Sequence, residues 1–338
     1  MTEYRAIDLF AGIGGIRLGF QQAFGNQMNF VFASEINKYA CDTYEENFNE
    51  RPAGDITSIP PEEIPDHDML LAGWPCQSFS MAGRKGGFGD PRGNLFFAIS
   101  NILKKKLPYS FLLENVYYLK RHDKKKTFKT IMHILEDELN YKVYYEILNA
   151  KYYGVPQNRP RIFIVGFREP IYFDFPPPSS TIPKLKTVLE KNVLSKYYLS
   201  QRYLDGLKNH RRRHEKLGHG FGYIVLDPDG VAKTLVIGGM GHERNLVKNT
   251  PTSDAYGGPR DDIGKPNKEG LRRLTPRECA RLQGYADSFK FPVSNTQAYR
   301  QLAESVAVPL IGKIALSMKK AIEERIPIAE SHNLKIIL

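Results

Sequence analysis

A cysteine at position 76 lies in a setting that would suit a catalytic nucleophile. It ends the sequence Gly73-Trp74-Pro75-Cys76, directly after a short apolar run, and a glycine-rich basic segment follows at residues 81–90. Pro75 restricts the backbone just before the thiol, and the following segment has the composition of a loop that can close over a phosphate backbone. A lone cysteine is also a common small core residue, so the pattern by itself fits either a nucleophile or a buried thiol.

Three more side chains could act on the same ligand. Glu114 lies near the end of an apolar run, where a carboxyl group can stay protonated and act as an acid. Arg159 and Arg161 are two residues apart in QNRPRIF, residues 157–163. In an extended strand both would point to one face and could hold an anionic or carbonyl-rich ligand. The plainer alternatives are a strand-end carboxylate paired with a lysine and two surface arginines.

The segment DLFAGIGG, residues 8–15, joins a predicted strand to a predicted helix through several glycines. Glycines there let the backbone turn tightly and approach a ligand closely. About 20 residues later, Glu35 ends the second predicted strand, where an acid can hold two ribose hydroxyls. Asp55 could accept a hydrogen bond from an adenine amino group, or simply cap a helix ahead of Thr57. These features predict a nucleoside-cofactor site, and a nicotinamide-dependent dehydrogenase is one candidate class.

Alternating strands and helices must position these residues. We predict strands over residues 4–9, 30–33, 69–72, 111–113, 141–148 and 162–165, and helices starting near residue 16, passing through residues 39–44, near residues 128–135 and over residues 299–324. This βαβα alternation predicts a mostly parallel sheet that helices cover on both faces. The glycine-rich turn, Glu35 and Cys76 would then lie at the carboxyl ends of strands, where such folds bind ligands.

The composition indicates a folded protein with a polyanionic partner. The 338 residues include 48 Lys and Arg against 37 Asp and Glu, a net charge of +11. An excess of this size favours a partner such as nucleic acid, although the basic runs at 104–106, 124–126 and 211–213 could each be a solvated face. The three cysteines show no metal-ligand or disulfide spacing, which fits a reducing cytoplasm. We expect no membrane span and no signal peptide.

The character of the chain changes at the breaker-rich run FPPPSSTIPK, residues 175–184. From there to about residue 297 the sequence is richer in glycine, basic residues and irregular segments. We therefore predict a larger domain built from residues 1–180 plus 296–326, and a second, smaller domain over residues 181–295.

Taken in order, the sequence blocks resemble the DNA (cytosine-5) methyltransferase family of the prokaryotic restriction-modification type over nearly the whole chain. The blocks are DLFAGIGG (8–15), Glu35, GDI (54–56), GWPCQSFS (73–80), DPRGNLF (90–96), ENV (114–116), QNRPRIF (157–163), RRLTPRECARLQGY (272–285) and QAYRQLAESVAVPL (297–310). Nine blocks in the family's order are far more specific than any one of them. The resemblance implies an α/β fold: a Rossmann-like doubly wound mixed sheet, the S-adenosylmethionine-dependent methyltransferase fold, with a smaller target-recognition domain over residues 181–295.

The resemblance gives the catalytic candidates specific roles. It implies transfer of the methyl group of S-adenosylmethionine to carbon 5 of a cytosine flipped out of double-stranded DNA, with S-adenosylhomocysteine as product. Cys76, as the thiolate, would add to carbon 6. Glu114 would protonate ring N3, while Arg161 and also Arg159 would hold the carbonyl and the intermediate. A thiol suits this chemistry because it adds readily, breaks the aromaticity of the ring, and leaves readily.

The resemblance also implies a set of cofactor-binding residues at the glycine-rich turn and at the ends of later elements. They are Phe10, Gly12, Gly14, Gly15, Glu35, Ile36, Asp55, Ile56, Pro75, Leu95 and Ser305. Glu35 would meet the ribose, Asp55 the adenine, and Ser305 would close the site from the C-terminal region. The sequence departs from the family at Ala303-Glu304, where Gly-Asn usually precedes the serine. No metal is expected.

DNA contacts are expected from the loop after Cys76 and from the smaller domain. The candidates are Ser80, Arg84, Lys85, Thr234, His242 and Arg244, with Asn245 as a further one. Side chains after the glycines at 238, 239 and 241 could read base edges in the major groove, although those glycines fit a simple tight turn equally well.

Three rival functions remain open at this point. An RNA cytosine-5 methyltransferase would share the scaffold, but its tRNA-acting branch usually carries a Cys-Phe-Thr tripeptide that this sequence lacks. A catalytically silent DNA-binding protein would have lost some of the candidate catalytic groups. A dehydrogenase would leave Cys76 and Glu114 unexplained. We therefore expect a cytoplasmic monomer whose partner is double-stranded DNA, with a separate cognate restriction endonuclease as a possible companion.

Overall fold

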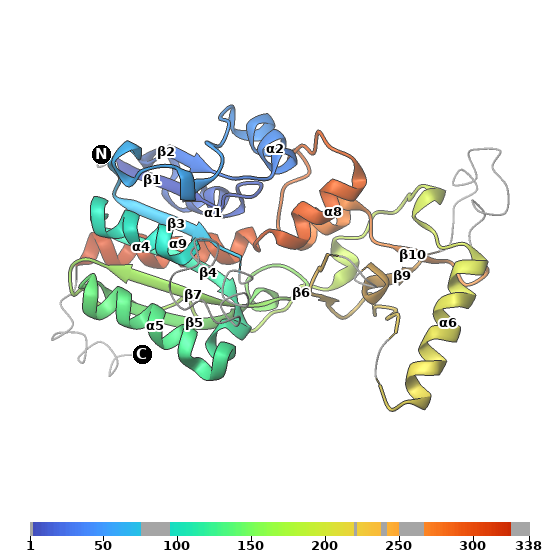
Figure 1. Cartoon of the computed structure of the whole chain (residues 1–338). Coiled ribbons are helices and arrows are strands. Elements are labelled where there is room, and N and C mark those ends of the chain that lie inside the picture. The colour runs from blue at the N-terminus through green and yellow to red at the C-terminus, as the bar shows by residue number, and fades with distance from the viewer. Residues whose placement is uncertain (1–2, 76–94, 220–221, 238–241, 250–266, 326–338) are drawn as a thin grey trace. The chain divides into compact units, whose positions relative to one another are not determined.

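The chain forms two compact units in the computed structural model, which describes residues 3–75, 95–219, 222–237, 242–249 and 267–325 (Figure 1). The first unit comprises Met1–Asn149, Pro160–Pro178 and Val308–Leu338, and the second comprises Ala150–Arg159 and Ser179–Ala307. The predicted split gave residues 150–159 and 296–307 to the larger domain, whereas they belong to the second unit.

Within the described residues, the first unit contains a six-stranded mixed sheet in the order β2-β1-β3-β4-β7-β5. Its strands are β1 (Tyr4–Leu9), β2 (Met28–Ser34), β3 (Met69–Gly73), β4 (Ser110–Val116), β5 (Lys142–Asn149) and β7 (Pro160–Phe167). The β2-β1, β1-β3 and β3-β4 pairs are parallel, whereas β7 runs antiparallel to both β4 and β5. The parallel strands therefore all end at one edge of the sheet, and β7 begins at that edge.

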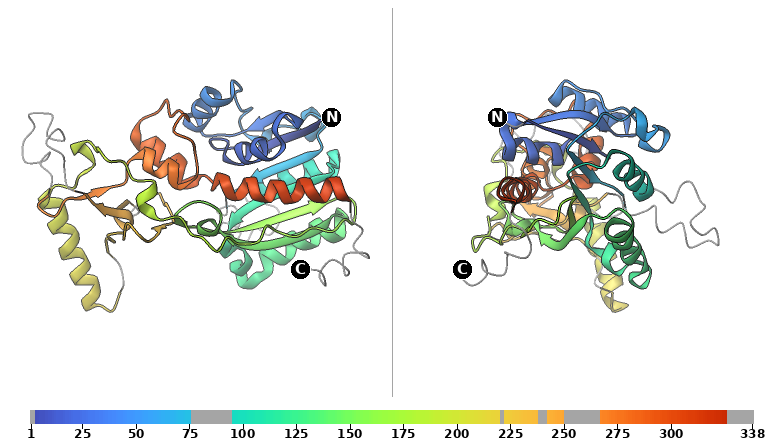
Figure 2. Two further views of the ribbon diagram at one scale, coloured as in Figure 1. Left: turned by 180° about the vertical axis from the view of Figure 1, so that it is seen from behind. Right: turned by 90° about the vertical axis from the view of Figure 1, so that its left-hand side faces the viewer.

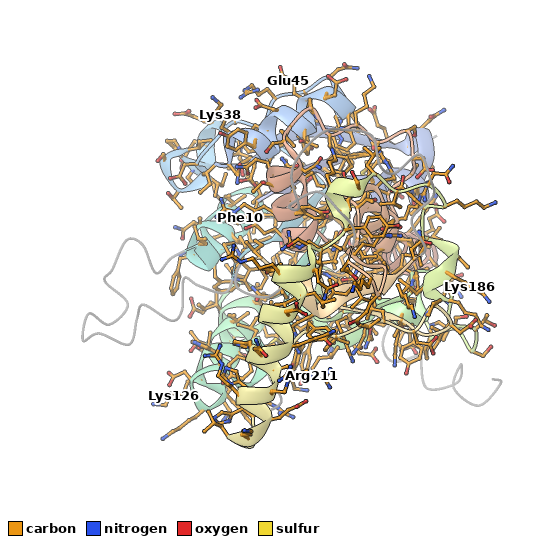
Figure 3. All side chains as sticks on the ribbon, turned by 90° about the vertical axis from the view of Figure 1, so that its right-hand side faces the viewer. Phe10, Lys38, Glu45, Lys126, Lys186 and Arg211 are labelled. Carbon is orange, nitrogen blue, oxygen red and sulfur yellow. The ribbon has the colours of Figure 1, made fainter. Side chains whose placement is uncertain are left out.

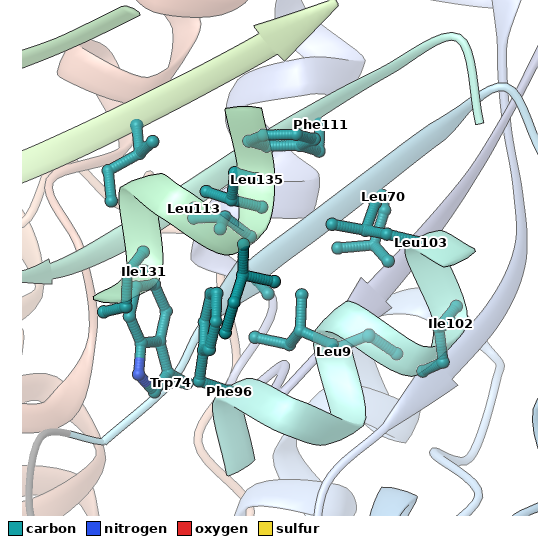
Figure 4. Close-up of a cluster of buried hydrophobic side chains, with 14 of the residues drawn as sticks. Leu9, Leu70, Trp74, Phe96, Ile102, Leu103, Phe111, Leu113, Ile131 and Leu135 are labelled. Atoms are coloured by element: carbon teal, nitrogen blue, oxygen red, sulfur yellow. The ribbon is translucent and has the colours of Figure 1, made fainter. Parts of the chain in front are cut away.

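Helices cover both faces of this sheet. They are α1 (Gly15–Phe24), α2 (Lys38–Phe48), α4 (Leu95–Lys106), α5 (Lys126–His133) and α9 (Val308–Glu324). Helices α4 and α5 bury apolar side chains in one large cluster with β1, β3, β4 and β7 (Figure 4). Helices α1 and α9 pack closely together on the opposite face, where a Cβ on Gly19 would lie 2.5 Å from Ile311 (Figure 2).

Residue spacing explains why these elements form. In β1, Ile7 and Leu9 alternate with Asp8, so two fully buried apolar side chains point to the α4–α5 face. In α4, Phe96, Ile99 and Leu103 recur at intervals of three and four residues and are all buried. Burying each such side chain stabilises the fold by about 2 kcal/mol.

The second unit is less regular. It contains two small sheets, one of β6 (Gln157–Asn158) with β8 (Ala232–Lys233) and one of β9 (Leu246–Lys248) with β10 (Leu271–Arg273). Its helices are α6 (Gln201–Lys216), α7 (Pro276–Leu282) and α8 (Asn295–Glu304). Helix α7 has a complete capping box: Thr275 accepts from the Glu278 N–H, and Glu278 accepts from the Thr275 N–H. Polar contacts therefore contribute much of the order here.

The predicted doubly wound mixed sheet is confirmed, and the predicted strands match the observed ones closely. Helices α4, α6 and α7 were not predicted from the sequence. The helix predicted over residues 299–324 is interrupted, because α8 ends at Glu304 and α9 begins at Val308. Within the described residues, the stretch Asn295–Glu324 has the length and hydropathy of a membrane-spanning helix, but 61% of that apolar window is buried inside the protein. This burial is what a core helix would show.

Candidate active site

The candidate residues of the first unit gather at the edge where the parallel strands end. The glycine-rich turn follows β1, Glu35 follows β2, and Trp74 and Pro75 follow β3. The register pairs Gly73 with Glu114, and Val116 with Arg161. In doubly wound folds, ligands bind in the crevice outside the carboxyl ends of the strands.

Positive backbone angles shape the glycine-rich turn after β1. Phe10, Gly12 and Gly14 have φ values of 54°, 54° and 77°, in the left-handed region. A Cβ on Gly14 would lie 2.2 Å from the Phe48 ring, so this position admits only glycine. A Cβ on Gly12 would meet nothing within 4 Å among the described residues, so the backbone there borders open space. The turn is thus tightly curved and mostly buried, and Gly12, which is partly exposed, is where its backbone can meet a ligand.

Glu35 links this turn to the end of β2. Its Oε2 accepts the Gly12 N–H at 2.8 Å and its Oε1 accepts the Asn37 N–H at 2.7 Å. Each carboxylate oxygen keeps a second lone pair for an outside donor such as a ribose hydroxyl. The neighbouring Ile36 is 75% exposed, which is unusual for a large apolar side chain and suits contact with a flat apolar ring.

The other cofactor candidates vary in exposure. Asp55 is exposed and caps a short helical turn, where its Oδ1 accepts the N–H and the hydroxyl of Thr57 at 2.9 and 2.7 Å. Asp55 can therefore cap this turn through Oδ1 and still accept a hydrogen bond from a ligand through Oδ2. The remaining candidates of this unit comprise buried Ile56, partly buried Phe10 and Leu95, buried Gly14 and Gly15, and exposed Pro75.

A buried ionic cluster supports the turn from below. Arg17, on α1, donates to Tyr44 at 2.9 Å and to Glu50 at 2.5 Å, and its guanidinium lies 4.5 Å from the Phe48 ring centroid. Asp8, on β1, is fully buried beside this cluster. Burial raises the pKa of the Asp8 carboxyl well above its usual value, and the charge of Arg17 opposes that rise. The sequence analysis did not identify this cluster, since nothing local to Asp8 indicates its distant partners.

Glu114 and Arg161 face each other across β4 and β7. Arg161 Nε lies 3.1 Å from Glu114 Oε1, and the two side chains are 14% and 10% exposed. Asn115, the next residue of β4, is buried and donates from Nδ2 to the Trp74 carbonyl at 2.8 Å. That bond fixes the backbone two residues before Cys76. Glu114 lies near the end of β4 and is buried, and its partner is an arginine where the sequence suggested a lysine as the plainer alternative.

Arg159 contacts backbone carbonyls of the second unit. The chain is not one strand at this point, since β6 ends at Asn158 and β7 begins at Pro160. The Arg159 side chain donates to the carbonyls of Leu235, Ala303 and Ser305, and the residue is only 2% exposed. The expected common face for the two arginines is therefore not found: Arg161 pairs with a carboxylate, and Arg159 holds backbone carbonyls.

Two glutamines extend this buried group. Gln157 donates to the Leu282 carbonyl at 2.9 Å and accepts the Leu235 N–H at 3.1 Å. Gln283 donates to the Leu302 carbonyl at 2.7 Å. We call Gln157, Arg159 and Gln283 the amide–guanidinium cluster. Ser305, the remaining cofactor candidate, lies beside it and shares a 2.6 Å hydrogen bond with Tyr285.

The DNA-reading candidates of the second unit fall into two groups. Thr234 donates to the Asn158 carbonyl at 2.6 Å, and Asn245 is buried and accepts the Lys233 N–H at 2.8 Å. Glu243 is also buried and accepts from the guanidinium of Arg273. Arg244 lies between these two anchored residues and is exposed. Its backbone is therefore held while its side chain remains available.

Several candidates lie outside the described residues. They are Cys76, Ser80, Arg84 and Lys85; His242 is described only in its backbone. The other cysteines, Cys41 and Cys279, are buried free thiols, and burial raises the pKa of both. Among the described residues, no group of His, Cys, Asp or Glu has the arrangement of a metal site.

The sheet order, the positive-φ turn after β1 and the acid after β2 define the class of Rossmann-like S-adenosylmethionine-dependent methyltransferase folds. A family model described as "C-5 cytosine-specific DNA methylase" matches residues 4–320, and the chain belongs to that family. It is a DNA (cytosine-5) methyltransferase.

Curated relatives agree with this assignment, and a solved structure shares the fold. The type II methyltransferase M.HpaII of Haemophilus parainfluenzae is 48% identical over 320 residues, which cover 91% of this chain and 87% of that protein. M1.ScrFI of Lactococcus lactis subsp. cremoris is 45% identical, over 96% of this chain and 80% of that protein. The structure of the Entamoeba histolytica methyltransferase EhMeth shares the fold, with a TM-score of 0.75 at 20% identity over 96% of this chain and 99% of that one.

Proposed function

We propose that this enzyme methylates cytosine in a specific double-stranded DNA word through a covalent adduct with Cys76, as the modification enzyme of a restriction-modification system. The observation that carries the proposal is the Glu114–Arg161 pair at the sheet edge, 3.1 Å apart. Glu114 is paired in register with Gly73, and Cys76 follows Gly73 by three residues in the sequence. An acid, a cation and a thiol are thereby assigned to one edge of the sheet.

S-adenosylmethionine is the proposed cofactor, and when bound it supplies an electrophilic methyl group. The described residues fit such a group: the turn at Gly12 borders open space, Glu35 keeps acceptor capacity for ribose hydroxyls, and Ile36 offers an exposed apolar surface. Asp55, with Oδ1 engaged in its cap, would accept from the adenine amino group through Oδ2. Phe10, Gly14, Gly15, Ile56, Pro75, Leu95 and Ser305 complete the proposed set.

The residues act on cytosine in a fixed order. Cytosine carbon 5 is a poor nucleophile while the ring is aromatic, so the Cys76 thiolate first adds to carbon 6. Glu114, in its protonated form, donates to ring N3 and neutralises the electron density that the addition pushes there. Arg161 holds the neighbouring carbonyl oxygen. Carbon 5 then takes the methyl group, and loss of its proton with expulsion of the thiolate restores the aromatic ring.

Arg159 has a different role in this proposal. Because its guanidinium holds the Leu235, Ala303 and Ser305 carbonyls, it acts as a positioning residue and does not contact the base. It keeps the segment around Ser305 in place for the cofactor. This assignment refines the shared catalytic role that the family resemblance implies for the two arginines.

The DNA partner requires the base to leave the helix stack, which costs a few kcal/mol that other contacts must offset. We assign base reading to the second unit, with Arg244 as the described candidate and Thr234 as a residue that orders the loop. His242, Ser80, Arg84 and Lys85 remain proposed DNA contacts from the sequence. The enzyme is proposed to act as a cytoplasmic monomer beside a separate cognate endonuclease.

A trapping experiment tests the proposal. Bisulfite sequencing of plasmid DNA from a host that expresses the chain first gives the methylated word. A duplex with 5-fluorocytosine at that position is then incubated with the enzyme and S-adenosylmethionine. Fluorine cannot leave carbon 5 as a proton does, so elimination stops and the protein should stay covalently attached. Denaturing electrophoresis should show a shifted band.

Two variants sharpen this result. Cys76→Ala should bind the duplex without forming the adduct and should not methylate DNA. Cys279→Ser, which changes a buried thiol on α7, should still form it. An adduct with the Cys76→Ala protein, or none with the native protein on a bound duplex, would refute the covalent mechanism.

A further inference from the structure

Helix α6 (Gln201–Lys216) of the second unit buries only a small part of its surface. Leu204 and Leu207 are its buried side chains, and they pack in a cluster with Leu199, Leu246 and Leu271. Its last turns carry Arg213, His214 and Lys216 and bury no apolar residue. In Figure 1 this end of α6 extends away from β9 and β10. Apolar packing therefore accounts for one narrow face of the helix only.

The opposite face is basic. Arg202, Asn209, Arg213 and Lys216 follow one another at intervals of seven, four and three residues, so they line one side of a helix with 3.6 residues per turn. That side points away from Leu204 and Leu207, and all four residues are exposed. We call these four residues the basic face of α6. At a rise of about 1.5 Å per residue, it extends over about 21 Å.

The cations of the basic face are not neutralised within the described residues. Two other cations of α6 have partners: Lys208 pairs with Glu269, and Arg211, labelled in Figure 3, pairs with Glu215 at 2.8 Å and lies over the Tyr223 ring. Arg212 lies outside the basic face and, like its members, forms no ion pair with a described residue. Arg202, Arg213 and Lys216 form no ion pair with any described residue. Asp205, one turn from Arg202, carries the one negative charge of α6 beside this face and accepts from Gln201. The basic face therefore keeps a net positive charge, and no described residue of its own unit covers it.

A second basic run of the chain differs from the basic face of α6, because most of its lysines form ion pairs. At the end of α4, Lys105 pairs with Glu62 at 2.9 Å and Lys106 with Asp66 at 3.1 Å. That run is largely neutralised by its own unit, as expected of a solvated face. The basic face of α6 is also unsuited to a membrane surface, because such helices expose an apolar face beside the basic one, and the two leucines here are buried.

We propose that the basic face of α6 docks on the phosphate backbone of duplex DNA beside the recognised word. The contacts would be independent of sequence, because Arg and Lys that meet phosphate oxygens fix the position of a protein without reading bases. The charge density of DNA, one phosphate per about 1.7 Å of axis, provides several partners along a 21 Å helix face. The choice of DNA as the polyanion rests on the proposed function.

Salt dependence gives a quantitative test. The triple variant Arg202→Gln, Arg213→Gln, Lys216→Gln removes three cations, and glutamine preserves helix propensity. Binding of the full chain to a fluorescent duplex of about 30 base pairs is measured by anisotropy between 50 and 200 mM KCl. Three lost phosphate contacts should reduce the slope of log K against log salt by about 2.7. The affinity ratio of native to variant protein should accordingly change about 40-fold over this range.

Two controls make the result specific. Lys104→Gln, Lys313→Gln, Lys320→Gln removes the same net charge from exposed positions on α4 and α9 and should keep the native slope. Arg202→Lys with Arg213→Lys keeps the charge on α6 and should also keep it. An unchanged slope in the glutamine triple variant, or an equal loss in the α4–α9 control, would overturn the proposal. An acidic protein or RNA as the true partner would give the first of these outcomes.

Methylation of the duplex by the native chain is measured in parallel. If the native chain binds DNA with the expected salt slopes but leaves cytosine unmodified, the proposed function fails and the docking surface stands. If it methylates DNA and the glutamine triple variant keeps the native slope, the docking surface fails and the function stands.

Discussion

The sheet edge of the first unit and the interior of the second unit use similar polar side chains in opposite ways. At the edge, Arg161 has one carboxylate partner and Glu35 retains acceptor capacity. In the interior, Arg159 is committed to three backbone carbonyls, and Arg272 forms a two-pronged pair with Glu278 in which both side chains are at most 1% exposed. Residue type alone therefore does not distinguish catalytic or ligand-binding side chains from structural ones. The identity of the partner and the depth of burial do.

The largest expected effect concerns Glu114 at the sheet edge of the first unit. Glu114→Gln removes the acid that serves N3, so kcat should fall about 10²- to 10⁴-fold, while DNA binding and the urea midpoint change little. Glu146→Gln alters an exposed carboxylate of β5 and serves as the matched control for steady-state methylation. Retention of more than about a tenth of native kcat by Glu114→Gln would show that this side chain has no part in proton transfer.

The second prediction separates the two arginines. Arg159→Met should lower the free energy of unfolding by about 3 kcal/mol, because it leaves buried carbonyls without donors. Arg161→Met should instead lower kcat about 10²-fold and affect unfolding less. Hydrogen exchange of peptides covering residues 302–307 should rise only in the Arg159 variant. Equal effects of both substitutions on the free energy of unfolding would contradict the assignment of a structural role to Arg159 and a catalytic role to Arg161.

The third prediction concerns the glycine-rich turn. Gly14→Ala should destabilise the first unit by about 2 kcal/mol and weaken cofactor binding, since it combines a positive φ with a clash against Phe48. Gly54→Ala is the control for stability, because its φ is also positive but nothing lies within 4 Å of the added Cβ. Fluorescence of Trp74, the single tryptophan, reports unfolding of this unit. Identical melting curves for the two variants would contradict the clash.

The smallest expected effect concerns pH. Because burial raises the pKa of Asp8 in the fold, the folded state holds the proton that the unfolded state releases. Its contribution is fully present below the unfolded pKa and is lost as pH rises through the folded pKa. Native stability should therefore fall from pH 5 to pH 8 relative to Asp8→Asn, by on the order of 1 kcal/mol. Parallel pH profiles of the unfolding free energy in the two proteins would show that Asp8 stays ionised.

Much of the first unit could be predicted from sequence because its signals are local. The strand predicted over residues 4–9 is β1, and the glycines after it do adopt the left-handed angles that a tight turn requires. Helix α4 was missed although Phe96, Ile99 and Leu103 have helical spacing and lysines close its last turn.

Other features had no local signal. Helix α6 contains only two buried leucines in 16 residues, so its pattern resembles a charged loop. The interruption after α8 is an exception, since Pro309 breaks helical hydrogen bonding locally, although the Ala303 and Ser305 carbonyls also meet Arg159, 144 and 146 positions earlier in the chain. The pairing of Arg161 with Glu114 likewise depends on strand register. Contacts at such separations follow from tertiary packing and are invisible to any window of neighbouring residues.

The path of the chain between β5 and β7 bears on how such enzymes can be recombined. The chain leaves the first unit at Asn149 and returns at Pro160, and the excursion contributes Gln157 and Arg159 to the second unit. A chimaera that exchanged residues 181–295 alone would pair these two side chains with a foreign backbone and would cut the unit before Ala303. Transplants intended to change the methylated word should carry residues 150–159 and extend to Ala307.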